Sequence, residues 1–299
     1  MVVQEHGSAT STPGQTDDPA AHTDKLRPAD RRRARPTARL RARPVVLGSL
    51  GVVLTIGIWE FVSRFVPVPG DSVPPTFDVA REFWHQLQLS TFWQAVWLTL
   101  QGWGIGLLIT IVIAVPFGLL VGASRVIWRA LRPTVEFLRS VPGVAFIPVA
   151  ILLFGQETQS TVFLVVFGAF WPLALQAMYG VREIDDVARQ TARVLRLTLW
   201  QRIRHLIVPS MLPFVATGVR IASAIALIAA ITCGLVLGNP GLGRSIAFAE
   251  AGAQINQMYA LIITSGVLGI LMNVGLTYLE RKAIFWVPQG RHQITESHK

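Results

Sequence analysis

The chain has 299 residues, of which 52% are hydrophobic and 15% charged, and a single soluble domain of this length could not hide so many apolar side chains in its interior. Its single cysteine, Cys233, excludes a disulfide framework and any zinc or iron–sulfur site built from cysteines. The net charge of +10 does not predict a nucleic-acid partner, because the basic residues lie in the gaps between apolar runs instead of along one soluble face.

The N-terminal segment, residues 1–44, is rich in Pro, Ala, Thr, Asp and Arg and has almost no large apolar residues. This composition predicts a disordered basic tail. The tail does not have the pattern of a secretory signal, because the apolar run that follows it is long enough to remain as a membrane span. Its arginines are expected to keep the N-terminus in the cytoplasm, where they could also touch anionic lipid.

Six apolar runs follow. A helix needs roughly 20 apolar residues to cross about 30 Å of hydrocarbon, and the length of each run is judged against this number. The predicted spans are Val45–Val66, Phe92–Val121, Val141–Phe154, Thr161–Tyr179, Met211–Leu237 and Met258–Tyr278. The third span is short and contains Pro142 and Pro148, which predicts a broken helix packed against protein. The second is long and contains Pro116, so we expect a kink or an extension beyond the membrane.

These runs predict an all-α integral membrane protein, with a six-span domain over residues 45–287 and a short C-terminal tail over residues 288–299. Residues 74–88, between the first two spans, should form a short amphipathic helix with Thr76 as its N-cap. In the second span Gly102 with Gly106, and Gly118 with Gly122, would let another helix approach closely.

The positions of Lys and Arg predict the orientation, because basic loops stay in the cytoplasm. The N-terminal tail, the gap after the second span, residues 181–209 and the residues after the sixth span are all basic. On the opposite side lie only Arg64, near the end of the first span, and Arg81 and Arg244 in the remaining gaps. Both termini and residues 181–209 are therefore expected on the cytoplasmic side.

The sequence contains no familiar catalytic or metal-binding pattern, such as GxSxG, HExxH or two carboxylates within one span. Residues 238–245 have the spacing of a phosphate-binding loop with Arg244 in place of the lysine, but they follow an apolar span instead of a buried strand. We interpret them as a closely packed turn. The chain is therefore not expected to be an enzyme or to bind a cofactor itself.

Charges inside predicted spans are few, which makes Arg220 a candidate functional residue. It could line a polar cavity or pair with a carboxylate. The alternative is that its side chain reaches toward the cytoplasmic face or caps helix carbonyls. Glu60, near the outer end of the first span, fits an interfacial position better than a proton relay, and the lack of a chain of intramembrane acids disfavours a secondary transporter.

Residues 181–209 combine arginines with apolar positions at helical spacing, in two short patterns that break near residues 196–198. The pattern predicts a helix, a turn and a second helix, with Pro209 starting the next span. Such a hairpin could place an apolar ridge into a groove of a partner protein, with arginines around the rim. An interfacial helix lying on lipid is the alternative.

The hairpin resembles the cytoplasmic signature of permease subunits of bacterial ABC importers, in the nitrate, sulfonate, taurine and bicarbonate group. That signature is Glu-Ala-Ala, three residues, Gly, nine residues, Ile, any residue, Leu-Pro. Residues 190–192 align with its triplet, Arg196 with its Gly and residues 208–209 with its Leu-Pro, and only Ala192 and Pro209 match strictly. If that Gly serves a turn with positive φ, Arg196 would be strained there, which predicts a rebuilt or shifted turn.

Other segments are also similar to this group. They are residues 140–155 in the third span, residues 218–222 in the fifth and Gly241-Leu-Gly243 in a short outer turn. The likeness covers about residues 45–287 and implies a type I importer permease fold, in which residues 181–209 form a coupling hairpin between the fourth and fifth spans.

The resemblance implies transport in a bacterial cell membrane without catalysis in this chain. Two ATP-binding subunits would hold ATP and Mg. A second permease subunit, either identical to this chain or different from it, would complete the translocation path. An extracytoplasmic binding protein would deliver a small solute such as a sulfonate or nitrate. The residues assigned to docking of the ATP-binding subunit are Gln190, Ala192, Val194, Leu195, Arg196, Leu199, Trp200 and Pro209. Those assigned to the translocation pathway are Arg220, Pro142 and Pro148. An ATP-independent transporter or channel is the alternative, and a structural scaffold is a third class.

Overall fold

The computed structural model describes residues 39–66 and 72–283, with side chains from residue 48 onward. Disorder was predicted for residues 1–44, of which residues 1–38 lie outside the described part, as does the tail at residues 288–299. Residues 39–44 belong to a helix, so the prediction was wrong there. The described part is helical throughout, and it divides into a unit ending at Thr55 and a larger unit from Ile56 onward. The first unit is the beginning of α1 (Arg39–Phe65), a helix that starts before the predicted boundary at Val45.

Five described helical stretches are long and apolar enough to cross a membrane. They are Gly48–Phe65, Ser90–Ala123, Thr158–Arg182, Leu199–Leu237 and Ile255–Lys282. These stretches confirm the first, second, fourth, fifth and sixth predicted spans. The second, α3 (Ser90–Ala123), continues through Pro116, and its 34 residues correspond to about 51 Å at 1.5 Å per residue, so the expected extension beyond the hydrocarbon is present.

The third predicted span differs from the sequence-based expectation. It is a bent pair, in which α4 (Arg125–Ser140) is followed by a 3-10 turn, η2 (Gly143–Phe146), and by α5 (Ile147–Phe154). The two parts meet at an angle of 81°. If the pair is counted as one span, the described residues contain up to six candidate membrane spans. The break at Pro142 was predicted, but the boundary at Val141 was wrong. The arginines of α4 lower its mean hydropathy, so a helix was missed where a loop was expected.

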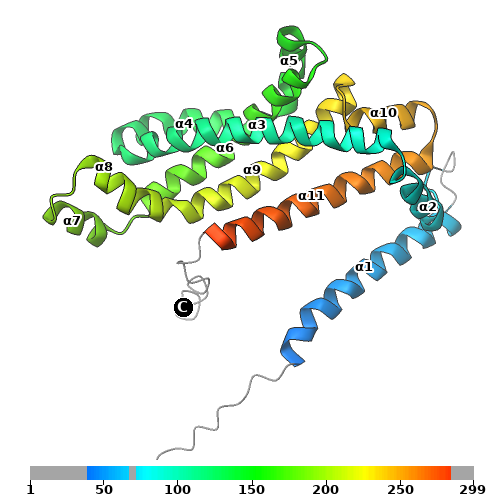
Figure 1. Ribbon diagram of the computed structural model, residues 1–299, viewed down its shortest axis with the longest axis horizontal. Coiled ribbons are helices and arrows are strands. Elements are labelled where there is room, and N and C mark those ends of the chain that lie inside the picture. Colours follow the sequence, from blue (N-terminus) through cyan, green and yellow to red (C-terminus); the bar gives the residue numbers. More distant parts are fainter. Residues whose placement is uncertain (1–38, 67–71, 284–299) are drawn as a thin grey trace, which may run out of the picture. The chain divides into compact units, whose positions relative to one another are not determined.

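The core of the larger unit is formed by α3, α6 (Thr158–Arg182) and α9 (Val208–Leu237), which lie side by side in Figure 1. The glycines of α3 face α6, as predicted. A methyl group added at Gly102 would come within 2.9 Å of Thr161, and one at Gly118 would come within 2.7 Å of the Ala174 carbonyl oxygen. These small residues therefore permit close contact of the two helices along their length.

Three further helices, α2 (Thr76–Gln86), α10 (Leu242–Ala251) and α11 (Ile255–Ala283), pack beside this core. α11 packs on α9 and on α2, and α10 lies between α9 and α11. The turn before α10 is the segment with phosphate-loop spacing. In it, Gly241 has a φ of 145° and the Leu242 amide donates to Thr99 Oγ1 over 2.8 Å, which supports its interpretation as a packed turn.

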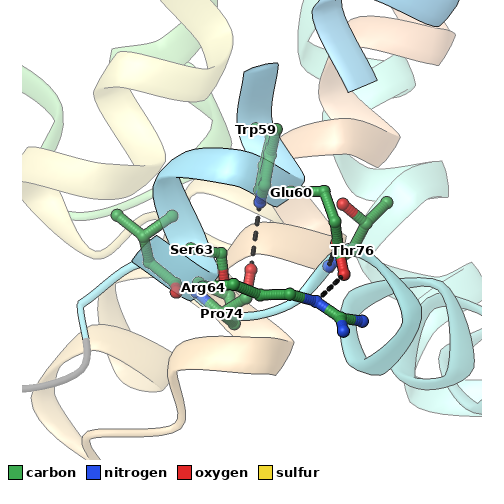
Figure 2. A network of polar contacts seen from close by, with 7 residues as sticks. Trp59, Glu60, Ser63, Arg64, Pro74 and Thr76 are labelled. Carbon is green, nitrogen blue, oxygen red and sulfur yellow. Dashed lines mark hydrogen bonds and ion pairs between the residues drawn. The ribbon is translucent and has the colours of Figure 1, made fainter. Parts of the chain in front are cut away.

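The N-terminus of α2 is held by the end of α1 (Figure 2). Glu60 receives the Thr76 backbone amide through Oε2 at 3.0 Å and the Arg64 guanidinium through Oε1 at 2.5 Å. Trp59 also donates its indole N–H to the Pro74 carbonyl oxygen at 3.0 Å. The predicted amphipathic helix is confirmed, but Thr76 is not its N-cap. It is the first helical residue, because a carboxylate from another helix accepts its amide.

Candidate functional site

The hairpin of residues 181–209 forms the most distinctive surface of the described chain, at the end of the core where α3 and α6 end and α9 begins (Figure 1). Its first arm is α7 (Asp186–Val194), whose N-terminus is capped by the Asp185 carboxylate, which accepts the Val187 amide at 3.0 Å. Arg189 donates to the carbonyl oxygens of Val181 at 2.7 Å and Ile184 at 3.2 Å. These two bonds fasten α7 to the end of α6.

The second arm begins with a capping box. The Thr198 hydroxyl accepts the Gln201 amide, and the Gln201 side chain accepts the Thr198 amide at 3.0 Å, so α8 (Leu199–Arg202) starts sharply. One π-helical turn, η3 (Ile203–Ile207), then leads into α9 without a break. The two-arm prediction is confirmed. Pro209 lies in the first turn of α9, as predicted, although this helix continues from α8 and η3 without a break.

The turn between the arms places Arg196 at a φ of 50°, in the left-handed region. The expectation of a rebuilt or shifted turn was wrong, since Arg196 adopts the positive-φ backbone itself. A left-handed conformation costs a residue with a side chain about 1–2 kcal/mol. The two hydrogen bonds that close α7 here, from the Arg196 amide to the Arg193 carbonyl and from the Leu197 amide to the Ala192 carbonyl, hold it in place.

The hairpin exposes a crest of apolar side chains. The exposed fraction is 81% for Val194, 75% for Leu199 and 69% for Trp200, and Leu195 is also exposed. Gln190 and Arg196 are exposed beside them, whereas Ala192 is buried and Pro209 is half-buried. The two residues that match the family signature strictly are thus the less exposed ones, and the exposed apolar surface lies at positions where the signature accepts any residue.

A cavity of about 390 Å³ lies where α4 bends into η2, against α6 and α9. Pro142 lines it together with Phe167, Trp171 and Thr232, and Arg139 lies at its edge. The indole N–H of Trp171 is buried and has no hydrogen-bond partner among the described residues. Arg139 and Thr232 bring polar groups to a largely apolar wall, a feature that sequence patterns did not predict. Pro148 does not line it.

Arg220 lies apart from Pro142. It lines a separate groove between α9 and α11, of about 490 Å³, together with Ser223, Ser265 and Asn273. Its Nη1 is 3.9 Å from Oε2 of Glu280 on α11. Of the two uses considered for Arg220, the approach to a carboxylate is present in this geometry, whereas the groove that Arg220 lines is mostly apolar. Glu280 was missed because it follows the predicted sixth span.

Cys233 is fully buried in α9 and accepts hydrogen bonds from Asn239 Nδ2 at 3.1 Å and from Thr161 Oγ1 at 3.4 Å. Asn239, itself 1% exposed, also donates to Ser160 at the start of α6. The packing role predicted for Cys233 is consistent with these contacts, which join the end of α9 to the start of α6.

Comparison with known proteins places these features in a family. Residues 114–285 match the family model described as the binding-protein-dependent transport system inner membrane component. An aliphatic sulfonates transport permease protein of Bacillus subtilis is 30% identical over 80% of this chain and 87% of its own length. A bicarbonate transport system permease of Synechocystis is 28% identical over 80% of this chain and 87% of that protein. A nitrate import permease, also from Synechocystis, is 23% identical over 87% of this chain and 96% of that protein.

Solved structures show the same fold. A chain of the inward-facing MetNI methionine ABC transporter superposes with a TM-score of 0.59 over 66% of this chain and 97% of that chain, at 20% identity. A chain of an amino acid ABC transporter superposes with a TM-score of 0.52 over 71% of this chain and 96% of that chain, at 14% identity. The helical core, the hairpin and the matched residues together show that this chain belongs to the family of binding-protein-dependent transport system inner membrane components.

Proposed function

We propose that this permease forms part of the membrane path of an ATP-binding-cassette importer for a small anion, such as a sulfonate, nitrate or bicarbonate. The names of the similar permeases support this solute class, since they specify sulfonates, nitrate and bicarbonate. The basic gaps of the sequence support a cytoplasmic location of both termini and of the hairpin in a bacterial cell.

The hairpin is the proposed contact with a separate ATP-binding subunit. Its exposed Val194, Leu195, Leu199 and Trp200 have the composition of the centre of a protein interface, and the neighbouring arginines would form the rim. ATP and Mg would be held by that partner. Two such subunits, a second permease and an extracytoplasmic binding protein complete the assembly that we propose, and this chain itself would break no bond.

The observation that carries the proposal is the continuous helical stretch from Leu199 to Leu237. A partner that displaces Trp200 would move this helical stretch, and its later part, α9, packs in the core against α3 and α6. Movement at the hairpin would therefore change the packing around the helices that enclose the pathway. An interfacial helix lying on lipid would need no such rigid link to the core.

An anionic solute fits two features of the described residues. Trp171, whose buried indole N–H has no hydrogen-bond partner among the described residues, lines the cavity at the α4 bend, and Arg220 lines the second groove beside Glu280. Hydrogen bonds from neutral and charged donors to an oxyanion would offset part of its loss of hydration. Both features lie against α9, and Ile228 lines both spaces.

The test is ATP-dependent uptake of an alkanesulfonate, nitrate and bicarbonate by proteoliposomes that contain the permease, its ATP-binding subunit and its binding protein. The double variant Leu195→Asp, Leu199→Asp should lose copurification with the ATP-binding subunit and lose uptake, whereas Leu195→Met should keep both. Unchanged copurification of the double variant would reject the docking surface. Uptake that continues without ATP would favour the ATP-independent transporter instead.

A further inference from the structure

A third cavity, of about 300 Å³, lies between the hairpin and the end of α6. Three of the residues that line it are arginines, Arg189 and Arg193 from α7 and Arg202 from α8, and its remaining wall is apolar, with Val181, Leu206 and Ile207. The cavity is thus enclosed by both arms of the hairpin. It adjoins the crest through Leu199, which lines it, whereas Val194, Leu195 and Trp200 do not.

None of the described residues that line this cavity is acidic. The acidic residues nearest in sequence are Glu183, Asp185 and Asp186, and none of the three contributes to the wall. Asp185 instead caps α7 through the Val187 amide. Three guanidinium groups therefore share a confined space without a carboxylate in its wall, and their mutual repulsion would be relieved by an anion.

The three arginines are held differently. Arg189 is fixed by the Val181 and Ile184 carbonyl oxygens, so its charge stays at the base of the hairpin. Arg202 is half-buried, and its Nε is buried with no hydrogen-bond partner among the described residues. The side chain of Arg193 makes no ion pair with any residue that the structure describes. A buried donor without an acceptor carries an energetic cost, which is larger when the group is charged. A ligand that accepts from Arg202 would remove that cost.

From these observations we infer that the cavity is a binding site for a phosphate-type oxyanion. Guanidinium groups donate pairs of N–H bonds to phosphate and similar oxyanions in a fixed geometry. The volume lies at the lower end of the range of small-ligand pockets. The oxyanion is either free phosphate or the phosphate of an anionic lipid headgroup. Because Arg193 is on α7 and Arg202 on α8, a bound oxyanion would tie the two arms together and stiffen the hairpin.

A carboxylate of a partner protein is less favoured as the occupant. The cavity is walled by the buried Val181 and Ile184 at the end of α6, and of the four exposed apolar side chains that a partner would contact only Leu199 lines it. The inference does not require that the hairpin dock on an ATP-binding subunit, because it concerns only residues within this chain.

The experiment measures binding to the full-length permease in neutral detergent by calorimetric titration at constant ionic strength. One arm uses inorganic phosphate and the other a short-chain phosphatidylglycerol, with short-chain phosphatidylcholine as the uncharged control. Arg202→Gln and, separately, Arg193→Gln should weaken binding about tenfold or more, because each removes a charge-assisted donor. The matched control is Arg204→Gln, since Arg204 is exposed on η3 and does not line the cavity.

Binding of phosphate that falls in Arg202→Gln and Arg193→Gln but not in Arg204→Gln would support a free-oxyanion site. The same pattern with phosphatidylglycerol alone would support a lipid headgroup. Equal weakening in all three variants, or no saturable binding of either ligand, would overturn the inference. It would also be overturned if the ATP-binding subunit abolished phosphate binding and Arg202→Gln released that subunit, since the occupant would then be a partner carboxylate.

Discussion

The backbone amide of Leu197 donates to the carbonyl oxygen of Ala192 over 3.1 Å, and this bond closes α7 around the left-handed Arg196. Together with the bond from the Arg196 amide to the Arg193 carbonyl, it forms the pattern that usually ends a helix with glycine. The family signature has glycine at this position. The hairpin of this chain keeps the positive-φ backbone conformation that glycine favours, but the residue in that conformation is an exposed arginine.

Arg196→Gly should therefore stabilise the turn by about 1 kcal/mol, because glycine adopts a positive φ without steric cost. This corresponds to about fivefold slower local opening, which amide hydrogen exchange of Leu197 would report. Arg193→Gly, inside α7, is the control and should accelerate exchange, because glycine destabilises a helix interior. Faster exchange at Leu197 in Arg196→Gly would contradict the turn described above.

Removing the Arg220 cation should affect transport more than stability. The side chains of Arg220 and Glu280 are 41% and 25% exposed and 3.9 Å apart, and pairs of this kind contribute about 0–1 kcal/mol. Arg220→Ala should therefore change the free energy of unfolding by less than about 1 kcal/mol while strongly reducing anion uptake in proteoliposomes.

The matched variant for Arg220→Ala is Glu280→Gln, which breaks the same ion pair but leaves the cation in the groove. It should retain uptake of the anion. Normal anion uptake by the Arg220→Ala variant would show that Arg220 has no part in the pathway. It would favour the alternative, in which the Arg220 side chain reaches toward the cytoplasmic face.

Gly243→Ala should strongly destabilise the contact between α10 and α9. A methyl group at Gly243 would overlap the Ile231 carbonyl oxygen and lie 2.7 Å from the Leu235 amide nitrogen, and backbone atoms cannot move aside as a flexible side chain can. We expect a loss of about 2 kcal/mol or more in thermal unfolding of the purified permease. Gly266→Ala is the control, since a methyl group there would meet no atom within 4 Å. A similar melting temperature for the two variants would refute this packing.

Glu60→Ala should loosen the start of α2. The variant removes the carboxylate that accepts the Thr76 amide, and the loss of a helix cap costs about 1 kcal/mol. Hydrogen exchange in the first turn of α2 should become faster, by about fivefold. Glu60→Gln keeps an acceptor oxygen and should show a smaller effect. Equal exchange in wild type and Glu60→Ala would show that the tail of α1 does not support α2.

The sequence predicted the features that depend on local composition. Five of the spans follow from runs of apolar residues, because the length and hydropathy of a helix are properties of neighbouring residues. The break at Pro142 and the two arms of the hairpin also follow from local patterns. Where local signals conflict, prediction was wrong, as in α4, whose arginines suggested a loop although its residues form a helix.

The sequence alone determined that this is a helical membrane protein with a basic hairpin between two spans, since apolar runs, prolines and arginines are read along the chain. Only the tertiary structure decided that Glu60 accepts the Thr76 amide, that Arg220 pairs with Glu280 and that three arginines enclose one cavity. These relationships join residues on different helices. They are set by how the helices pack, which no local pattern encodes.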